Sequence, residues 1–206
     1  AYYYSSPGLA WDAMLKMTKV RLELMQDREM HCIIDKEIRG GICCISRKHA
    51  MANNPLIDET FDPTKPTSYI LYLDMNNLYG AAMIEPLHEK EFDFLLEEQI
   101  ASFDLMSVPD DGPIGYILEV DIDYPSELHD MHNDYPLCPV SQVININDLS
   151  PYTISLADKL GIKPTGYKKL IANLEPKERC AVHYRKLKLF VKLRIKITKI
   201  SSKLSI

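Results

Sequence analysis

The sequence predicts an α+β fold, in which strands and helices follow one another without a regular β-α-β alternation. Three observations lead to this class. The hydrophobic fraction of 46% is ordinary for a globular protein. Short apolar runs bounded by Pro and Gly are typical of strands, and segments of helical periodicity lie between them. The length of 206 residues allows one large domain, or one and a half small ones.

Four helices and two strands are expected in the first half of the chain. The expected helices are residues 11–17, 28–36 capped by Asp27, 77–84 stopped by Pro86, and 97–103. The expected strands are residues 42–46 and 68–74, separated by a loop at 53–66 that holds three prolines.

The second half is expected to begin with a strand at 114–122. Residues 123–151, rich in Pro, Asn and Asp, indicate an extended excursion. Helices are expected at 151–160 and 182–192. Residues 193–204 alternate apolar and basic side chains, which predicts a half-buried strand with one cationic face.

The charge is divided unevenly along the chain. Residues 1–158 carry 10 Lys and Arg against 27 Asp and Glu, a net charge of −17, whereas residues 159–206 carry 14 against 2, a net charge of +12. A basic segment of this kind is typical of a surface that follows a phosphate backbone. The alternative is a solvated basic face that pairs with the acidic remainder.

Composition excludes several classes. Five cysteines, an odd number without a C-x-x-C pair, indicate reduced thiols in an intracellular protein. No apolar run reaches 18 residues, so no membrane span is expected. No secretory signal pattern is present at the start, and no particular compartment follows from the sequence.

Asp74 is the strongest candidate functional residue. It follows an apolar run, residues 69–73, which predicts a buried strand, and it precedes a turn at 76–80. A carboxylate at the end of a buried strand is well placed to hold a divalent cation, because the strand fixes it and the turn opens to solvent.

The segment D-x-N-x-L-Y-G at 74–80 resembles the first catalytic motif of family B DNA polymerases, D-x-x-S-L-Y-P, in the variant of the protein-primed branch. The similarity extends in the same order over nearly the whole chain. It includes residues 5–15, 38–41, 115–125, 128–137, 169–177 and 182–187.

The resemblance implies a partial polymerase palm, an antiparallel sheet backed by helices, with an inserted region. Residues 1–40 would be a linker and helical segment, 41–110 the first part of the palm, and 111–206 the region between the first and second polymerase motifs. The implied activity is template-directed two-metal nucleotidyl transfer in DNA replication. The implied partners are a DNA template and primer, a dNTP and a priming terminal protein, with no membrane.

The resemblance also assigns roles to the residues around Asp74. Asp74 and the Met75 carbonyl would hold Mg²⁺, in a two-metal site of which this chain supplies half. Backbone N–H groups of Asn77, Leu78 and Tyr79 would bind the nucleotide phosphates, and the Tyr79 ring would exclude a 2′-hydroxyl. The alternative is structural: Asp74 caps a helix and Tyr79 is a core aromatic.

Two further segments are candidates for DNA binding. Arg39 with Gly40 and Gly41 lies where the family has a Tyr-x-Gly-Gly loop, although these residues also fit a simple turn after a helix. The other candidates are Arg185, Lys186 and Lys188, which equally fit a cationic helix face over buried Tyr184 and Leu187.

Two weaker patterns contain possible metal ligands. Glu119, Asp121 and Asp123 share one face of a predicted strand, where a solvated edge is the favoured interpretation. His129 and His132 lie three residues apart in a predicted loop, where hydrogen bonds that order the loop are favoured over a metal.

The chain departs from the family at several points. Ile38 replaces the loop Tyr, Arg194 stands where Gly is expected, and Ser201-Ser202 replace a basic pair. The sequence contains neither a Lys-x-x-x-Asn-Ser-x-Tyr-Gly helix nor an Asp-Thr-Asp hairpin. We therefore expect an interior fragment that is inactive alone. The alternative is a non-catalytic module that binds nucleic acid or the primer protein, or a degenerate remnant of a mobile element.

Overall fold

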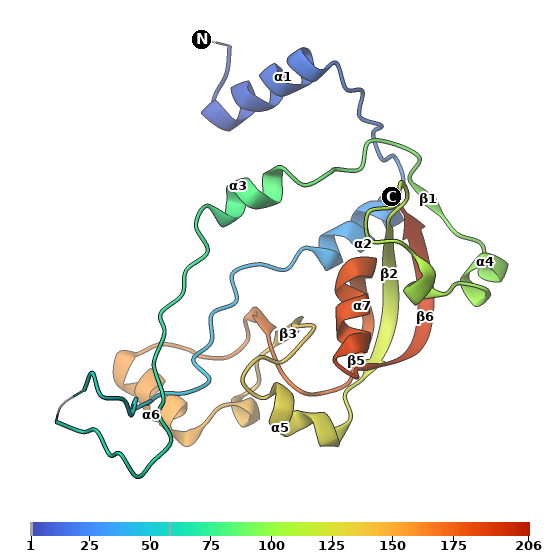
Figure 1. The fold of residues 1–206 in the computed structure, drawn as a ribbon. Helices are drawn as coiled ribbons and strands as arrows, with labels where there is room; N and C mark the ends of the chain where they lie inside the picture. Colours follow the sequence, from blue (N-terminus) through green and yellow to red (C-terminus); the bar gives the residue numbers. More distant parts are fainter. Residues whose placement is uncertain (1, 58) are drawn as a thin grey trace. The chain divides into compact units, whose positions relative to one another are not determined.

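The computed structural model describes residues 2–57 and 59–206, and its mixed helices and antiparallel strands confirm the α+β class. The chain forms two compact units (Figure 1). The first, here called the sheet unit, combines the segment up to Ile42 with His88–Ile206. The second, here called the 43–87 unit, is Cys43–Leu87. The domain boundaries predicted after residues 40 and 110 stay predictions.

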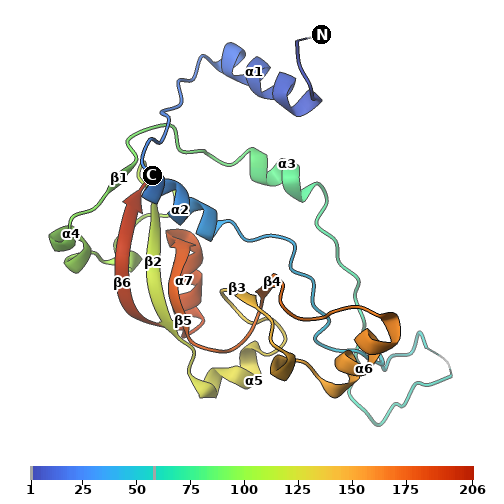
Figure 2. The same cartoon turned by 180° about the vertical axis from the view of Figure 1, so that it is seen from behind.

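A four-stranded antiparallel sheet organises the sheet unit (Figures 1 and 2). Its strand order is β1-β6-β2-β5. The strands are β1 (Asp93–Phe94), β2 (Tyr116–Asp123), β5 (Lys177–His183) and β6 (Lys196–Ser205). Strand β2 is central and pairs along its length with β5 and β6, while β5 and β1 are the edges. The predicted strands at 114–122 and 193–204 are therefore confirmed.

Each face of this sheet is covered by one helix. Leu118 and Val120 point to the face where helix α7 (Tyr184–Lys192) packs, and they form a core with Leu187. Ile117, which directly precedes Leu118, points to the opposite face and packs with Ile33 of helix α2 (Arg28–Glu37). The alternation of β2 thus serves two apolar layers, which is why none of its residues is exposed.

Two bulges in β6 change the predicted alternation of that strand. Val120 pairs with Ile200, and Ile122 pairs with Ile197. Because of the bulges, Ile197 and Ile200 lie on the same α7 face although they are three positions apart, where regular alternation would place them on opposite faces. On the other face, Asp121 is opposite Lys199 and Asp123 is opposite Lys196. The cationic face predicted for this strand therefore lies across from the acidic residues of β2.

A second, two-stranded sheet lies in the predicted excursion. It pairs β3 (Val140–Val143) with β4 (Lys168–Ile171). Helix α6 (Pro151–Leu160) connects them and matches its predicted bounds, with Ser150 as its N-cap and Gly161 in the left-handed conformation at its end. The short helix α5 (His129–His132), η2 (Ser126–Leu128) and η3 (Ile146–Asp148) complete this region.

The remaining helices of the sheet unit are α1 (Ser6–Thr18), α4 (Glu97–Ala101) and η1 (Leu105–Ser107). The Asp27 cap of α2 is present, since its Oδ1 accepts the Glu29 N–H at 2.6 Å. Across the described part of the chain, every helix is too short or too polar to span a bilayer.

Among its described residues, the 43–87 unit has the helix α3 (Leu78–Met83), which confirms the helix predicted at 77–84. A bridge joins Asn53 and Ser68 in the same unit. The Asn53 side-chain amide donates to the carbonyls of Asp62, Lys65 and Pro66 and so closes the predicted loop; residue 58 lies outside the described residues.

Two predicted strands are wrong, and four strands were not predicted, among them the two-residue β1. Residues 42–46 form no strand, and of the strand predicted at 68–74 only Ser68 pairs, in its bridge with Asn53; no other described segment offers a backbone ladder to either run. Strand β5 was missed because its first half is charged and its end was assigned to the following helix. Strands β3 and β4 have four residues each, which is too short for a clear alternation.

Candidate functional site

The apolar run before Asp74 is exposed rather than buried. Tyr69, Ile70, Leu71, Tyr72 and Leu73 all lie on the surface, and Tyr72 is 94% exposed. Asp74 itself is exposed, and no described residue hydrogen-bonds or ion-pairs with its carboxylate. The predicted setting at the end of a buried strand is therefore wrong in this structure, whereas the free carboxylate is available to a ligand.

Asn77 and Gly80 shape the turn that follows Asp74. Asn77 has the left-handed backbone conformation, with φ 51° and ψ 48°, which Asn tolerates better than most residues. Its Oδ1 accepts the N–H of Gly80 at 3.2 Å and caps α3. A Cβ on Gly80 would lie 2.7 Å from that Oδ1, so an Ala at this position would displace the capping amide. The Asn77 cap therefore depends on the absence of a side chain at Gly80.

The structural alternative for this segment is also wrong. Asn77, and not Asp74, caps the helix, and Tyr79 is 87% exposed rather than part of a core. Met75 and Leu78 are exposed as well. The side chains of 74–79 are therefore held by the backbone turn alone, with little side-chain packing.

The ligand set for a cation is incomplete. Within the described residues, no group of three or more His, Cys, Asp or Glu side chains is placed to hold a metal ion. Asp74 and the Met75 carbonyl fit a hard cation chemically, since Mg²⁺ prefers oxygen ligands and takes the rest from phosphates and water. One carboxylate supplies only part of what a two-metal centre requires.

Arg39 serves an internal contact. Its Nε donates to the Pro139 carbonyl at 2.9 Å, and its Nη1 donates to the carbonyls of Ala181 at 2.7 Å and Glu37 at 3.2 Å. These bonds join the end of α2 to β5 and to the loop before β3. Gly41 has a left-handed φ of 76°, and nothing lies within 4 Å of a Cβ placed on it or on Gly40. A DNA contact by Arg39, Gly40 or Gly41 stays a prediction.

The three predicted cations of α7 differ in environment. Lys188 is nearly buried and donates to the Val108 carbonyl and, at 2.7 Å, to Asp110 Oδ1, a hydrogen bond that lowers the Asp110 pKa. Lys186 pairs with Glu37 at 2.9 Å. Arg185 donates through Nε to the Tyr184 hydroxyl at 3.4 Å. These contacts agree with a cationic helix face over buried Tyr184 and Leu187, and a DNA contact by the three stays a prediction.

Other basic side chains have no such internal partner. Lys192, Arg194 and Lys196 are exposed around the turn from α7 to β6, and no ion pair joins any of the three to another described residue. Lys168 and Lys169 of β4 are exposed in the same way. The sequence showed the net positive charge of residues 159–206, but it did not show which of these cations lack an ion pair.

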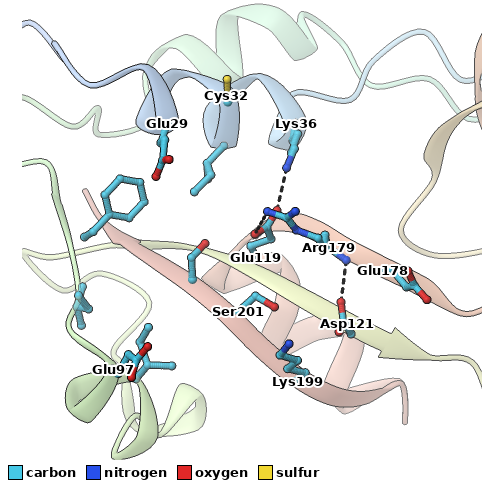
Figure 3. A pocket seen from close by; sticks show the side chains of 15 residues that line it. Glu29, Cys32, Lys36, Glu97, Glu119, Asp121, Glu178, Arg179, Lys199 and Ser201 are labelled. Carbon is cyan, nitrogen blue, oxygen red and sulfur yellow. Dashed lines mark hydrogen bonds and ion pairs between the residues drawn. The ribbon is translucent and has the colours of Figure 1, made fainter.

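Glu119 is the centre of a charged network on the α2 face. It accepts from Lys36 at 2.8 Å and from Arg179 at 3.2 Å, although its side chain is only 4% exposed (Figure 3). Burial acts to raise the pKa of Glu119, but the two cationic hydrogen bonds outweigh it and hold the pKa below its ordinary value. Because β2 is a central strand, the predicted solvated edge is wrong for this residue.

A hollow of about 890 Å³ opens above this network. It lies between α2, the segment from Phe94 to α4, and the sheet (Figure 3). Asp121 accepts the Arg179 backbone N–H at 2.8 Å on its floor, and Lys199 lies beside it. Glu119 pairs with Lys36 and Arg179, whereas no ion pair joins Lys199 to another described residue, so the hollow has a polar and mixed-charge lining.

The two loop histidines hydrogen-bond with Tyr124. The Tyr124 hydroxyl lies 2.7 Å from His132 Nδ1, and His129 Nε2 lies 3.2 Å from the Tyr124 carbonyl. This supports the interpretation that they order the loop. His132 Nε2 is buried, and no described residue bonds to it.

One close pair was not found from the sequence. The thiols of Cys138 and Cys180 are both buried in the core that α7 covers, and each shifts the pKa of the other. They lie far apart in the chain without a spacing motif, so only the packing of the loop at 138 against β5 reveals them.

No family model matches the sequence, and neither the curated proteins nor the solved structures compared with this chain include a match.

Proposed function

We propose that this chain is part of a DNA polymerase of the protein-primed family B type, in which Asp74 supplies one carboxylate of a two-metal nucleotidyl-transfer centre. The proposal rests on the resemblance of residues 74–80 to the first catalytic motif, together with one structural observation. That observation is an exposed carboxylate without an internal partner, followed by a left-handed turn that Asn77 and Gly80 maintain together.

The exposed run at 69–73 supports a centre that is completed elsewhere. Five consecutive large apolar side chains are exposed, and exposed apolar surface of this extent typically marks a surface that another element covers. The run is rich in strand-forming residues, so a strand paired alongside it would bury these side chains and fix Asp74 at its end. The Asp-Thr-Asp hairpin that the resemblance implies would bring both a strand and the second carboxylate.

In this proposal, Mg²⁺ would bind the Asp74 carboxylate and the Met75 carbonyl, and a dNTP would lie over Asn77, Leu78 and Tyr79. When bound, the ion would neutralise the phosphate oxygens. The chain's own part is to present the carboxylate and the backbone N–H groups at the turn. With one carboxylate, the 206 residues are expected not to extend a primer.

Paramagnetic relaxation tests the ion site directly. Adding Mn²⁺ with a deoxynucleoside triphosphate to the ¹⁵N-labelled chain should broaden the amide signals of 74–79 before those of the remaining residues. Asp74→Asn should remove this broadening, because an amide is a much weaker ligand than a carboxylate. Asp35→Asn, which changes another exposed Asp, is the matched control and should leave it intact. Broadening that persists in Asp74→Asn would refute the site.

A second function, binding of single-stranded DNA without catalysis, is favoured by the free cations at Lys192, Arg194 and Lys196. Each phosphate contact adds about 0.7 to the slope of log affinity against log salt for a single strand. Replacing all three by Gln should therefore reduce the slope by roughly 2.

The matched control for this measurement is the triple Gln variant of Lys16, Lys19 and Arg21, which removes the same charge from another exposed stretch. Fluorescence anisotropy with a labelled oligonucleotide at several salt concentrations measures both slopes. Equal slopes for the two triple variants would show that binding follows net charge and not this surface. Affinity that does not change with salt would exclude the DNA-binding function altogether.

A further inference from the structure

Cys138 and Cys180 are held together at one edge of the main sheet. Cys180 belongs to β5, the edge strand, and Cys138 belongs to the loop that enters β3. Both side chains pack in the core that α7 covers, where Cys138 is placed to donate a hydrogen bond to Cys180 Sγ, and Cys180 Sγ donates to the Glu178 carbonyl at 3.8 Å. Cys138 has a left-handed φ of 50°, which is uncommon for a residue with a side chain, so packing holds the loop in this form.

The Arg39 side chain links the two segments that carry these thiols through hydrogen bonds. Its hydrogen bonds end on the carbonyls of Pro139 and Ala181, which are the residues directly after Cys138 and Cys180. The guanidinium is thereby fixed beside both sulfur atoms. Lys177 lies near them as well, with its Nζ donating to the Asn173 carbonyl at 3.0 Å. Two thiols between two fixed cations form an environment that favours a thiolate.

The charge falls unequally on the two sulfur atoms. The hydrogen bond from Cys138 is the main cause that lowers the pKa of Cys180 to about 7; burial opposes it, and Arg39 and Lys177 assist. The same hydrogen bond, with burial, raises the pKa of Cys138. Cys180 is therefore the nucleophile of the pair, and Cys138 is the thiol that responds.

We propose that Cys138 and Cys180 form a redox modification site, which a peroxide oxidises to an intramolecular disulfide. The Cys180 thiolate attacks one peroxide oxygen, so an S–O bond forms, the O–O bond breaks and hydroxide leaves. Cys138 then attacks the sulfenic sulfur, an S–S bond forms, and the S–O bond breaks. The Cys138 proton leaves with the departing oxygen as water. Two thiols are oxidised, one peroxide is reduced, and two waters result.

Cys138 and Cys180 are only 3% and 4% exposed, so the proposed oxidant is a small one such as hydrogen peroxide. No strand covers the outer side of β5 in the described sheet, and its residues Glu178 and Arg179 are exposed. The disulfide would close the long loop between the two cysteines, which holds β3, α6 and β4. Closing a loop of this length removes much entropy from the unfolded chain. The oxidised form should melt roughly 10 °C above the reduced form.

The test uses the full chain with the exposed Cys32, Cys43 and Cys44 replaced by Ser, so that only the pair remains. Hydrogen peroxide is added to the reduced protein under native conditions. We expect a monomer that has lost two hydrogens, with Cys138 and Cys180 in one cross-linked peptide and a higher Tm. The same variant with Cys138→Ser should instead accumulate a sulfenic acid at Cys180, trapped by dimedone. Peptide mapping of the oxidised wild-type chain provides the same result if the Ser variant folds poorly.

The pH profile separates this site from an accidental cross-link. The rate of oxidation should be half-maximal near pH 7, the pKa of Cys180. Arg39→Met should move this midpoint to higher pH because it removes a positive charge that stabilises the Cys180 thiolate. Lys90 is exposed and pairs with Glu91, so the control Lys90→Met should leave the midpoint unchanged. The proposal is overturned if oxidation gives only intermolecular dimers or if the disulfide forms only in urea. It is also overturned if Arg39→Met leaves the pH of half-maximal oxidation unchanged.

Discussion

Two similar apolar segments of this protein have opposite environments. Residues 116–123 form β2, where Leu118 and Val120 are fully buried between β5 and β6. Residues 69–73 are equally rich in strand-forming side chains, yet all five are exposed and no described strand pairs with them. The difference does not lie in local propensity. It lies in whether other segments provide a backbone ladder and a covering helix.

This comparison separates the part of the molecule that has an apolar core from the part that carries the proposed chemistry. The sheet unit has two apolar layers and a helix on each face. The 43–87 unit has one short helix and side-chain bonds around Asn53. Its run of large apolar side chains at 69–73 is exposed, which is typical of a surface that a partner covers.

The largest effect is expected from deleting apolar side chains in the two segments. Leu118→Ala removes a fully buried side chain and should lower the free energy of unfolding by about 3 kcal/mol. Leu71→Ala removes a side chain that is 76% exposed and should change it by less than about 0.5 kcal/mol. Urea denaturation followed by circular dichroism measures both values. A loss above about 1 kcal/mol for Leu71→Ala would show that the apolar run is covered in solution.

The same contrast explains which elements could be predicted from the sequence. Strand β2 and helices α2 and α6 were found because caps and periodicity act within the segment itself. The strand at 69–73 was wrongly predicted because its pattern reports a preference for burial and not the presence of a partner. Strand β5 was missed because its apolar residues come last, where they overlap the helical pattern of α7.

The candidate site was predictable to a similar extent. The motif spacing drew attention to Asp74 as a candidate. The sequence showed Asn77 and Gly80 only as a variant of the family's motif, whereas the structure shows that Asn77 has a left-handed backbone and that its side chain caps α3 against Gly80. The position of Arg39 was not predictable. Its three carbonyl acceptors come from α2, the loop before β3 and β5, which are brought together only by the fold. The Cys138 and Cys180 pair has the same origin.

A buried cation gives the next largest contrast. Lys203 of β6 is 2% exposed, with Nζ 2.9 Å from the centre of the Phe103 ring and 4.0 Å from that of Tyr116. Burial lowers the pKa of Lys203 to about 8. Lys203→Met should raise the free energy of unfolding at pH 7 by about 2 kcal/mol, because the aromatic rings offset only part of the desolvation. Lys65→Met, at a lysine of the 43–87 unit that is 70% exposed and pairs with Asp62, should change it by less than about 0.5 kcal/mol.

The pH dependence of this effect has a definite sign. The pKa of Lys203 is lower in the folded chain than its ordinary 10.5, so between about pH 8 and 10.5 the unfolded chain holds the proton and the folded chain does not. Stability of the wild type should therefore rise with pH in this window, and below about pH 8 the penalty is complete. Lys203→Met should remove the rise. Parallel curves for the two proteins between pH 8 and 10.5 would contradict the buried-amine account.

The smallest effect concerns two left-handed residues, one in each unit. Arg194 has φ 68° in the turn between α7 and β6, at the position where the resemblance expects Gly. Arg194→Gly should therefore raise the free energy of unfolding of the sheet unit by about 1 kcal/mol, since Gly adopts this conformation without a Cβ penalty.

Asn77→Gly relieves a similar φ of 51° but removes the cap of α3. Because α3 contributes nothing to the core of the sheet unit, this change should leave global unfolding unaltered and increase only the local amide exchange of 78–83. Urea denaturation measures the first change, and native-state hydrogen exchange measures the second. If Asn77→Gly lowered the stability of the whole chain, the two units would unfold together, and the separation between a packed sheet unit and an unpartnered segment around Asp74 would be wrong.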